Sequence, residues 1–430
     1  MNVLILGAAV SGTAAAHLAR RLGHGVEVYD EQVAALGSWR AEGFMVHSGP
    51  WSARLIEGVD LVVTSPGIPE TAAPFVDTLT AGIPLWSEME FGARHLDAPC
   101  VAVTGTNGKT TVANATAAML EHTGVKVCAA GNIGTALSSV VGEPWDVVVV
   151  EASSFQLRFT EAFHPVAAAL LNVAPDHLDW HGTEAAYAAA KARIYVNQDP
   201  QDILVFDADD PGAVAAVAGA GSTTVPISGR RLPAGGNGVD GDVVVIGDVE
   251  LPRPDLDVSY LSDLVAAGTL ARHVGADPDG VGTVLSSFEP GPHRRTVVGR
   301  WDGVTWVDDS KATNPHAAVA AASAYRDVVL IAGGRNKGLD LAPLVAVPSV
   351  RHVVALGEAA QELVAVAPAR VTVVDTMDAA VEAADQLAAP GTTVLLAPGC
   401  ASFDMFRSYG ERGDRFRRLV VEHKGVDDGQ

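Results

Sequence analysis

Runs of apolar residues, each ended by a glycine or a cluster of polar residues, recur along the whole chain. In the first half they cover residues 3–6, 59–63, 101–104 and 147–150. Each is short and rich in Val, Leu and Ile, which is typical of strands buried on both faces of a parallel sheet. Segments with apolar residues at a spacing of three and four lie between them. The alternation predicts an α/β protein.

The last third of the chain repeats this alternation. Strands are predicted over 328–332, 352–356, 371–374 and 393–397, with helices between them. The strands predicted between 203 and 249 are short, and one helix is predicted over about 259–273. At 430 residues the chain is long enough for about three domains. Proline-containing segments at 97–99 and 290–292 suggest the boundaries, so we expect domains over 1–97, 98–298 and 299–430, the first and last being Rossmann-like.

The turn G-T-N-G-K-T joins one predicted strand to a predicted helix. Gly105 and Gly108 let the backbone turn so that its N–H groups converge on an anion, Lys109 adds a charge, and Thr110 offers a hydroxyl to Mg²⁺. The full Walker pattern has glycine in place of Val103, so this turn is a shorter variant. An ordinary strand-to-helix turn is the alternative. The context favours an ATP site in a P-loop ATPase-like central domain with a mostly parallel sheet.

The N-terminal segment has the pattern of a βαβ nucleotide-binding unit. Gly7 and Gly12 follow the first strand, Ala9 stands in place of the middle glycine of the dinucleotide fingerprint, and Asp30 ends the second strand. Alone, this pattern would suggest an NAD-dependent dehydrogenase. The missing middle glycine weakens the close approach to a pyrophosphate.

Polar residues follow directly after two strands of the central domain. Glu151 follows strand 147–150, and a strand over 165–171 is followed by Asn172 and by the loop that carries His177. Ligands of open α/β sheets bind at the carboxyl ends of strands, so we expect the phosphate loop, Glu151 and His177 to converge. A carboxylate and an imidazole beside a triphosphate suit Mg²⁺. A solvated strand end and a structural histidine are the alternatives.

A lysine stands on the apolar face of the helix predicted over 184–198. Tyr187, Ile194 and Tyr195 line that face, and Lys191 lies among them. Burial of a lysine is costly, so Lys191 either extends to solvent along its stem or is held by carboxylates, a metal or chemical modification.

Two polar segments follow strands of the last domain. Residues 308–315 read DDSKATNP, and residues 333–338 read GGRNKG. The second could present Lys337 to a phosphate, or it could be a plain basic turn.

The amino-acid composition argues against some classes of binding partner. The formal net charge of −22 argues against nucleic acid and anionic membranes, which would repel such a surface. Three cysteines without metal or redox spacing fit a reducing cytoplasm. The start lacks the pattern of a signal peptide, and no apolar run is long enough to insert in a membrane, so a cytoplasmic location is expected.

Seven motifs in order resemble the Mur ligase family over nearly the whole chain. They are GTNGKTT, EASSFQL (151–157), NVAPDHLDWHG (172–182), AAKARIY (189–195), PHR (292–294), DDSKATNP (308–315) and APGCASFDMF (397–406). Segments 153–157 and 309–314 resemble the D-glutamate-adding member. The diaminopimelate- or lysine-adding member typically has SSH at 153–155 and a DNPR motif that is absent here.

The resemblance implies roles for individual residues, which stand here as expectations. The uridine and pyrophosphate of UDP-N-acetylmuramoyl-L-alanine would lie near Val10, Ser11, Asp30, Ser65, Gly67 and, in the central domain, Asn132. ATP would contact Gly105, Thr106, Asn107, Gly108, Lys109, Thr110, Thr111, Arg294, Asp309 and Lys311. Metal ions, Mg²⁺ or Mn²⁺, would be organised by Thr110, Glu151, His177 and Lys191, the last as a carbamate. D-glutamate would meet Thr313, Lys337, Ser402 and Tyr409, where Tyr409 replaces the usual Phe.

The resemblance implies that the protein is an ATP-dependent amide ligase of peptidoglycan precursor synthesis that works through an acyl phosphate. The catalytic residues would be Lys109, Glu151, His177 and Lys191. The enzyme would act as a monomer. One helix departs from the family, because Tyr260 and Asp263 replace two asparagines that help to hold adenine. Alternatives are another Mur ligase, a folylpolyglutamate-synthase-like ligase, a nicotinamide dehydrogenase and a non-catalytic nucleotide-binding scaffold.

Overall fold

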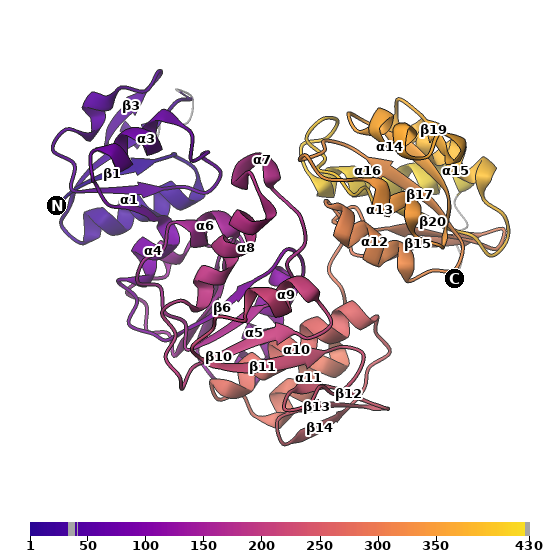
Figure 1. Cartoon of the computed structure of the whole chain (residues 1–430), viewed down its shortest axis with the longest axis horizontal. Helices are drawn as coiled ribbons and strands as arrows, with labels where there is room; N and C mark the ends of the chain where they lie inside the picture. Colours follow the sequence, from indigo (N-terminus) through magenta and orange to yellow (C-terminus); the bar gives the residue numbers. More distant parts are fainter. Residues whose placement is uncertain (33–38, 41, 426–430) are drawn as a thin grey trace. The chain divides into compact units, whose positions relative to one another are not determined.

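A computed structural model describes residues 1–32, 39–40 and 42–425, and it divides the chain into two compact units. The first unit comprises residues 1–173 and 185–288, and the second comprises residues 174–184 and everything from 289 onward. Helices pack on both faces of the mainly parallel sheets (Figure 1), so the predicted α/β class is confirmed.

The first unit begins with a five-stranded sheet in the order β3-β2-β1-β4-β5, in which every pair is parallel. Its strands are β1 (Asn2–Leu6), β2 (Gly25–Asp30), β3 (Met45–Ser48), β4 (Leu61–Thr64) and β5 (Leu85–Ser87). The helical segments around it are α1 (Val10–Arg21), η2 (Ala53–Ile56), α3 (Ala73–Thr80) and α4 (Glu88–Ala93). The pattern did not predict β3, because this short edge strand has exposed ends and no apolar run.

A nine-stranded sheet forms the rest of the first unit, in the order β14-β13-β12-β11-β10-β9-β6-β8-β7. Its strands are β6 (Cys100–Thr104), β7 (Val127–Gly131), β8 (Val147–Glu151), β9 (Ala167–Leu170), β10 (Ile203–Asp207), β11 (Thr223–Ser228), β12 (Asn237–Asp240), β13 (Val243–Ile246) and β14 (Val249–Pro252). The pairs β12–β13 and β13–β14, at one edge of the sheet, are antiparallel, and the other described pairs are parallel. The mostly parallel central sheet predicted from the sequence is therefore present.

Helices cover both faces of the nine-stranded sheet. They are α5 (Lys109–His122), η3 (Leu137–Ser139), α6 (Ser154–Arg158), α8 (Glu184–Ala192), η4 (Arg193–Tyr195), α9 (Pro211–Ala216), α10 (Val258–His273) and α11 (Pro278–Ser287). Buried side chains of α5, α10 and α11 form one core, and those of α6 and α9 contribute to a second on the other face. The helix expected over 184–198 changes to a 3₁₀ turn after Ala192, and α5 ends before Gly124 in the left-handed conformation, as its position suggested.

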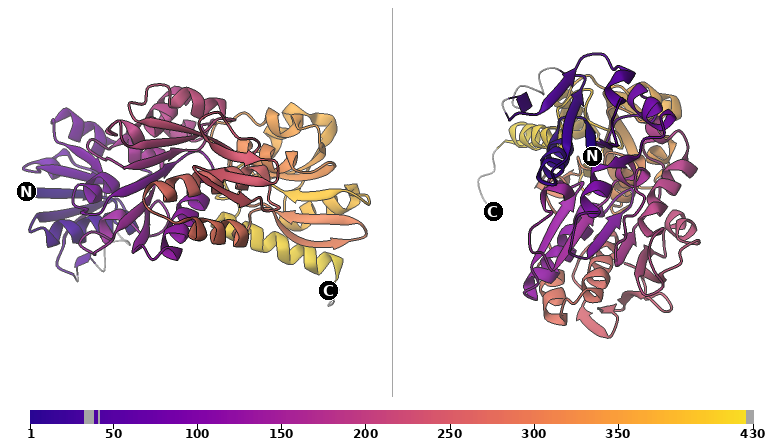
Figure 2. Two further views of the ribbon diagram at one scale, coloured as in Figure 1. Left: turned by 90° about the horizontal axis from the view of Figure 1, so that it is seen from below. Right: turned by 90° about the vertical axis from the view of Figure 1, so that its left-hand side faces the viewer.

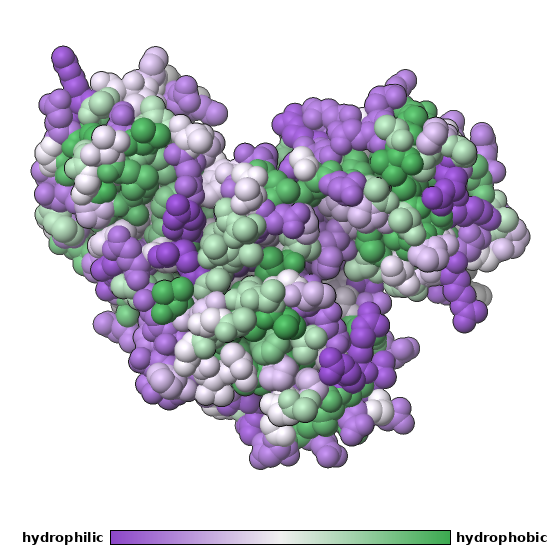
Figure 3. All heavy atoms as spheres, in the orientation of Figure 1, coloured by the Kyte–Doolittle hydropathy of each residue, from purple (hydrophilic) through white to green (hydrophobic). Residues whose placement is uncertain are grey.

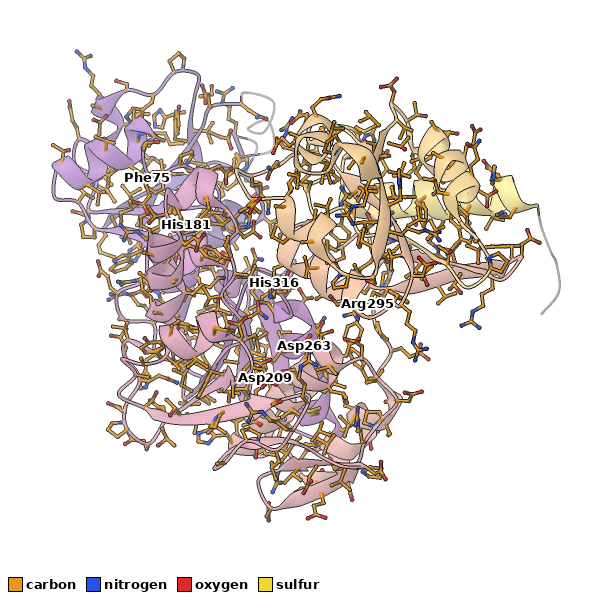
Figure 4. The ribbon with its side chains drawn as sticks, turned by 45° about the vertical axis from the view of Figure 1, so that its right-hand side comes forward. Phe75, His181, Asp209, Asp263, Arg295 and His316 are labelled. Atoms are coloured by element: carbon orange, nitrogen blue, oxygen red, sulfur yellow. The ribbon has the colours of Figure 1, made fainter. Side chains whose placement is uncertain are left out.

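Buried carboxylates join the two sheets of the first unit. Glu90 accepts hydrogen bonds from the backbone N–H groups of Ala162 and Phe163, at 2.8 and 3.0 Å. The rings of Phe75 and Phe159 pack edge to face at 5.1 Å between centroids, and Figure 4 labels Phe75. These contacts link the N-terminal sheet to the loop after α6.

The carboxylate of Glu88 makes this junction sensitive to pH. Its Oε1 accepts from the Ser138 N–H at 2.6 Å, whereas no residue that the structure describes donates a hydrogen bond to the buried Oε2. Burial raises the pKa of Glu88 from 4.5 to about 6. The folded state holds the proton of Glu88 more tightly than the unfolded chain does. The contribution of protonated Glu88 to the free energy of unfolding is therefore fully present below about pH 4.5, and it is lost as the pH rises through about 6.

We therefore expect Glu88→Gln to remove part of the pH dependence of stability. Between about pH 4 and 7, the free energy of unfolding should fall by roughly 2 kcal/mol more in the unaltered protein than in the variant. Urea unfolding at several pH values measures this difference, and Glu143→Gln, at an exposed carboxylate, is the control. Identical pH dependences for the unaltered protein and Glu88→Gln would contradict the assignment.

The second unit contains a six-stranded sheet in the order β15-β16-β20-β17-β18-β19. Its strands are β15 (Thr296–Trp301), β16 (Val304–Asp308), β17 (Val328–Gly333), β18 (Val350–Leu356), β19 (Val371–Val373) and β20 (Thr393–Leu396). Its helical segments are α7 (Leu178–His181), α12 (Pro315–Ser323), α13 (Ala342–Ala346), α14 (Ala360–Val366), η5 (Pro368–Arg370), α15 (Met377–Leu387) and α16 (Tyr409–Lys424). The four strands predicted after residue 327 are all present.

The long helix α16 lies along one side of this sheet (Figure 2). Its buried residues Phe416, Leu419 and Val420 join the core that contains Trp306 of β16. Helix α16 is thus packed against the sheet through one apolar stripe, and the rest of its sequence is rich in arginine and glutamate.

Two observations concern the surface. None of the helices among the described residues is both long and apolar enough to cross a bilayer. Hydrophobic side chains gather over α3 in Figure 3, where Val76 and Leu79 are 49% and 59% exposed.

Candidate active site

The phosphate loop lies between the end of β6 and the start of α5. Gly108 adopts a left-handed conformation with φ of 86° at the N-terminus of α5, where the backbone N–H groups have no partners within the helix. A Cβ at this position would collide with the carboxylate of Asp263 on α10, a residue labelled in Figure 4. Glycine is therefore required here both by the backbone and by the close approach of Asp263.

Asn172 holds the loop in place. The N–H of Asn107 donates to Asn172 Oδ1 at 2.8 Å, and Asn172 Nδ2 donates back to the Asn107 carbonyl at 3.1 Å. The N–H of Thr106 donates to the Asn172 carbonyl at 2.9 Å. The loop therefore lies at the carboxyl end of β9, and Asn172 has a positioning role that the sequence alone did not assign.

Two lysines reach the same backbone carbonyl. Lys109 Nζ donates to the carbonyls of Gly105 and Thr106, at 2.9 and 3.0 Å. Lys191 Nζ donates to the Gly105 carbonyl at 2.7 Å and lies 4.5 Å from the ring centroid of Tyr187. Lys191 is only 1% exposed, so it does not extend to solvent. Two nitrogens capable of carrying positive charge therefore meet at the loop predicted to bind phosphate.

Glu151 ends β8, opposite Val103 of β6 and Gly131 of β7 in the register of the sheet. It is 2% exposed, which excludes a solvated strand end. Its Oε1 accepts from Asn132 Nδ2 at 3.0 Å, whereas Oε2 is buried and has no hydrogen-bond partner among the described residues. An unpaired buried carboxylate oxygen is costly unless a cation binds it.

The donors near the loop fit a hard divalent cation. Glu151 offers its unpaired oxygen, and Thr110, the second residue of α5, carries the hydroxyl that the motif assigns to Mg²⁺. Among the predicted metal ligands, Thr110, Glu151 and Lys191 belong to the first unit and His177 to the second. Convergence of His177 with the other three stays a prediction.

His177 lies in a segment that packs within the second unit. Its φ of 53° is left-handed, and its N–H donates to Asp176 Oδ1 at 2.8 Å. Asp176 forms an ion pair with Lys337, and Asn314 Nδ2 donates to its Oδ2 at 3.1 Å. Burial alone would raise the pKa of Asp176, but Lys337 and His177 outweigh it and hold this pKa below its ordinary value. Asp176 and Asn314 were not singled out from the sequence.

The residues predicted to contact UDP gather at the carboxyl edge of the five-stranded sheet. Val10 and Ser11 begin α1, and Asp30 Oδ2 accepts from the N–H of Ala8 in the preceding turn at 2.8 Å. Ser65 Oγ lies 3.5 Å from the Gly7 carbonyl, and Gly67 follows two residues later. Asn132 is the exception, since it follows β7 of the nine-stranded sheet and donates to Glu151.

In the second unit, the segment after β16 brings charged residues together. Asp309 Oδ1 accepts from the N–H of Arg295 at 3.2 Å, and Arg294 directly precedes Arg295 in the chain. Burial raises the pKa of Asp309 to about 6, although Arg295 opposes this shift. Lys311 Nζ lies 4.0 Å from the ring centroid of Tyr409.

The four residues predicted for D-glutamate come from separate loops of this unit. Thr313 follows β16, Lys337 follows β17, Ser402 follows β20 and Tyr409 begins α16. The carboxyl ends of three adjacent parallel strands therefore carry three of them. A buried pair between His293 Nδ1 and Asp308 Oδ2, at 2.7 Å, lies in the same unit, and Asp308 is the last residue of β16. Its sequence signal was the pair of aspartates that opens the segment 308–315.

Comparison with known families matches separate parts of the chain. The Mur ligase middle domain matches residues 103–230, and the Mur ligase glutamate ligase domain matches residues 293–400. The C-terminal domain of alanine dehydrogenase/PNT matches residues 1–140, in agreement with the dinucleotide-like pattern around Gly7.

Curated relatives match over almost the full length. A UDP-N-acetylmuramoylalanine–D-glutamate ligase of Frankia casuarinae is 43% identical, with 99% of this chain and 95% of the relative covered. A ligase of the same name from Shouchella clausii is 41% identical, covering 97% and 96%.

Two solved structures share the fold. The MurF structure from Acinetobacter baumannii has a TM-score of 0.62 at 16% identity and covers 98% of this chain and 93% of its own. A bifunctional folylpolyglutamate synthase/dihydrofolate synthase with Mn, AMPPNP and L-glutamate bound has a TM-score of 0.55 at 18% identity and covers 77% and 93%.

Proposed function

This chain belongs to the Mur ligase family, and we propose on that basis how its residues carry out the reaction. It is an ATP-dependent ligase that adds D-glutamate to UDP-N-acetylmuramoyl-L-alanine in peptidoglycan precursor synthesis, as its full-length relatives are named. One observation in the structure supports this assignment. Lys109 and Lys191 both donate to the Gly105 carbonyl, and the buried Glu151 at the end of β8 lies opposite Val103 of β6, the strand that leads into the loop.

The phosphate loop is proposed to bind ATP. The N-terminus of α5 and the Lys109 ammonium supply positive potential for the β- and γ-phosphates. Thr106, Asn107 and Thr111 belong to the same loop and helix. Arg294, Asp309 and Lys311 of the second unit are proposed to contribute to nucleotide binding, by resemblance to the family.

Mg²⁺ is the proposed metal, with Mn²⁺ as a substitute. Thr110 and Glu151 would hold it, together with His177 and a carbamate on Lys191. When bound, the metal offsets the negative charge that accumulates on the transferred phosphoryl group.

The chain's own residues then act by position and charge. The substrate carboxylate attacks the γ-phosphate of ATP, which breaks the bond to ADP and forms an acyl phosphate. Lys109 stabilises the charge on the transferred group. The amine of D-glutamate attacks the acyl carbon, phosphate leaves with the bonding electrons, and the amine loses a proton. No nucleophilic side chain is required.

The two substrate sites are proposed at sheet edges. Val10, Ser11, Asp30, Ser65 and Gly67 would bind the uridine diphosphate, and Asn132 would reach the rest of this substrate. Thr313, Lys337, Ser402 and Tyr409 would bind D-glutamate. Lys337 would then exchange its carboxylate partner Asp176 for a substrate carboxylate. We also propose that the enzyme acts in the cytoplasm as a monomer.

One assay tests the function. ADP release should require both UDP-N-acetylmuramoyl-L-alanine and D-glutamate, and it should not depend on NAD. Release that needs neither acceptor nor amino acid would exclude the ligase. Addition of glutamate to a folate, in place of the UDP substrate, would favour the folylpolyglutamate-synthase-like alternative.

Selectivity for the amino acid is a sharper expectation. D-glutamate should be accepted, whereas L-glutamate and diaminopimelate should be rejected, because carboxylates must meet Lys337 and Ser402 in one fixed geometry. A site built for hydrogen bonds can discriminate by about ten-thousandfold in kcat/KM. Turnover of each amino acid under identical conditions measures this ratio. Comparable turnover with diaminopimelate would show that the amino-acid site has been assigned to the wrong family member.

A further inference from the structure

Arg412 of α16 is buried in the second unit, and within the part of the chain that the structure describes no hydrogen bond or ion pair joins it to a carboxylate. It is 2% exposed. Its Nε donates to Ser310 Oγ at 3.0 Å, Nη2 to the Ser310 carbonyl at 2.9 Å, and Nη1 to the Cys400 carbonyl at 3.1 Å. Burial lowers the pKa of Arg412 to about 10, so the guanidinium remains charged at neutral pH. The hydrogen bonds of this charge thus go to three neutral oxygens, and the carboxylates of Asp404 and Asp308 favour the charged form electrostatically.

The residues that Arg412 contacts lie in the loops proposed to bind D-glutamate. Ser310 lies three residues before Thr313, and Cys400 lies two residues before Ser402. Ser310 Oγ also donates to the carbonyl of Tyr409, at 2.8 Å, on the same helix as Arg412.

The third loop is reached through Gly334. A Cβ on Gly334 would lie 3.3 Å from Arg412 Nη1, so the guanidinium packs against the start of the loop that carries Lys337. Hydrogen bonds at 2.9 and 3.0 Å between Arg335 and Ala401 tie this loop to the segment containing Ser402. Arg412 therefore contacts, directly or through one bond, the segments that carry all four residues.

Stability alone does not account for an arginine here. Apolar side chains of similar volume usually stabilise a core as well as buried charged groups do, because they avoid the cost of desolvation. A planar guanidinium instead supplies several directed hydrogen bonds and a positive potential. Both properties suit a site that must orient a dicarboxylate.

We propose that Arg412 is a positioning residue for the amino-acid substrate: it fixes the three loops that carry Thr313, Lys337 and Ser402, and its charge favours the binding of the substrate's carboxylates. This inference rests on the proposed function. It assigns Arg412 no contact with the substrate itself.

The test is steady-state kinetics of the full-length enzyme with each substrate varied in turn. In Arg412→Ala, the KM for D-glutamate should rise about tenfold or more, while the KM values for ATP and the UDP substrate stay within about threefold. Arg412→Lys should recover little, since one ammonium cannot make the same set of bonds. Guanidinium ion at low concentration should lower the raised KM of Arg412→Ala, compared with sodium chloride at equal ionic strength.

Controls separate this role from folding. Arg415→Ala removes a half-exposed arginine of the same helix that pairs with Asp378, and its constants should match those of the unaltered enzyme. Equal changes in all three KM values, or an unchanged KM for D-glutamate in folded Arg412→Ala, would overturn the proposal. If Arg412→Ala does not fold, Ser310→Ala decides: a selective rise in the KM for D-glutamate supports the proposal, and no rise overturns it.

Failure of the proposed function would be recognised separately. If the unaltered enzyme releases no ADP with D-glutamate, the assigned reaction is wrong whatever the variants do. Hydrogen exchange then still reports on Arg412, because loops 309–314, 333–338 and 399–404 should exchange faster together in Arg412→Ala and not in Arg415→Ala. Unchanged exchange in those loops would overturn the positioning role.

Discussion

Replacement of Lys109 by alanine is expected to reduce kcat by on the order of a thousandfold, the usual effect of removing one preorganised charge from a site of phosphoryl transfer. In the structure Lys109 Nζ bonds to the carbonyls of Gly105 and Thr106, so its side chain is already folded over the loop. No large rearrangement is needed to place the ammonium beside bound phosphate. Rates of ADP release at saturating substrates measure the loss.

Lys126→Ala is the matched control for this prediction. Lys126 is exposed in the same domain and lies 5.1 Å from the ring centroid of Trp145, away from the loop. Its removal should leave kcat unchanged. If Lys109→Ala kept a kcat within about tenfold of the unaltered enzyme, the loop could not have the proposed role in catalysis.

Replacement of Lys191 by alanine should have an effect of similar size, and short carboxylic acids should restore part of the activity. The reason is that Lys191 is proposed to carry a carbamate. Burial at 1% exposure disfavours the ammonium form, a neutral amine adds CO₂ with release of a proton, and the product is an anionic metal ligand. The carbamate nitrogen keeps one N–H, which can still donate to the Gly105 carbonyl.

An unmodified ammonium is the competing assignment for Lys191. Its position 4.5 Å from the ring centroid of Tyr187 suits a cation as well. Loss of activity in Lys191→Ala fits both assignments, so rescue decides between them. Acetate or formate should restore turnover in Lys191→Ala and not in Lys109→Ala, where a cation is missing. Absence of rescue, together with absence of bound label after incubation with isotope-labelled bicarbonate, would leave the ammonium.

Much of the fold was predictable because its signals are local. Apolar runs predicted β1, β4, β6 and β8 close to their observed bounds, since strands buried on both faces need continuous apolar sequence. Edge strand β3 escaped prediction because it needs no such run. The glycines of the phosphate loop could be predicted from their spacing in the sequence. The left-handed backbone at Gly108 depends mainly on the residue being glycine, so it requires no knowledge of distant parts of the chain.

The sequence by itself determined the α/β class, the phosphate loop and a set of strand-end residues with chemistry suited to ATP and a cation. Only the tertiary structure decided which of them meet. Lys191 reaches Gly105 from 86 positions away, Lys337 reaches Asp176 from 161, and Arg412 reaches Ser310 from 102. These distances along the chain are closed by strand order and register, which depend on the packing of all helices and strands together, and no local pattern of residues contains that information.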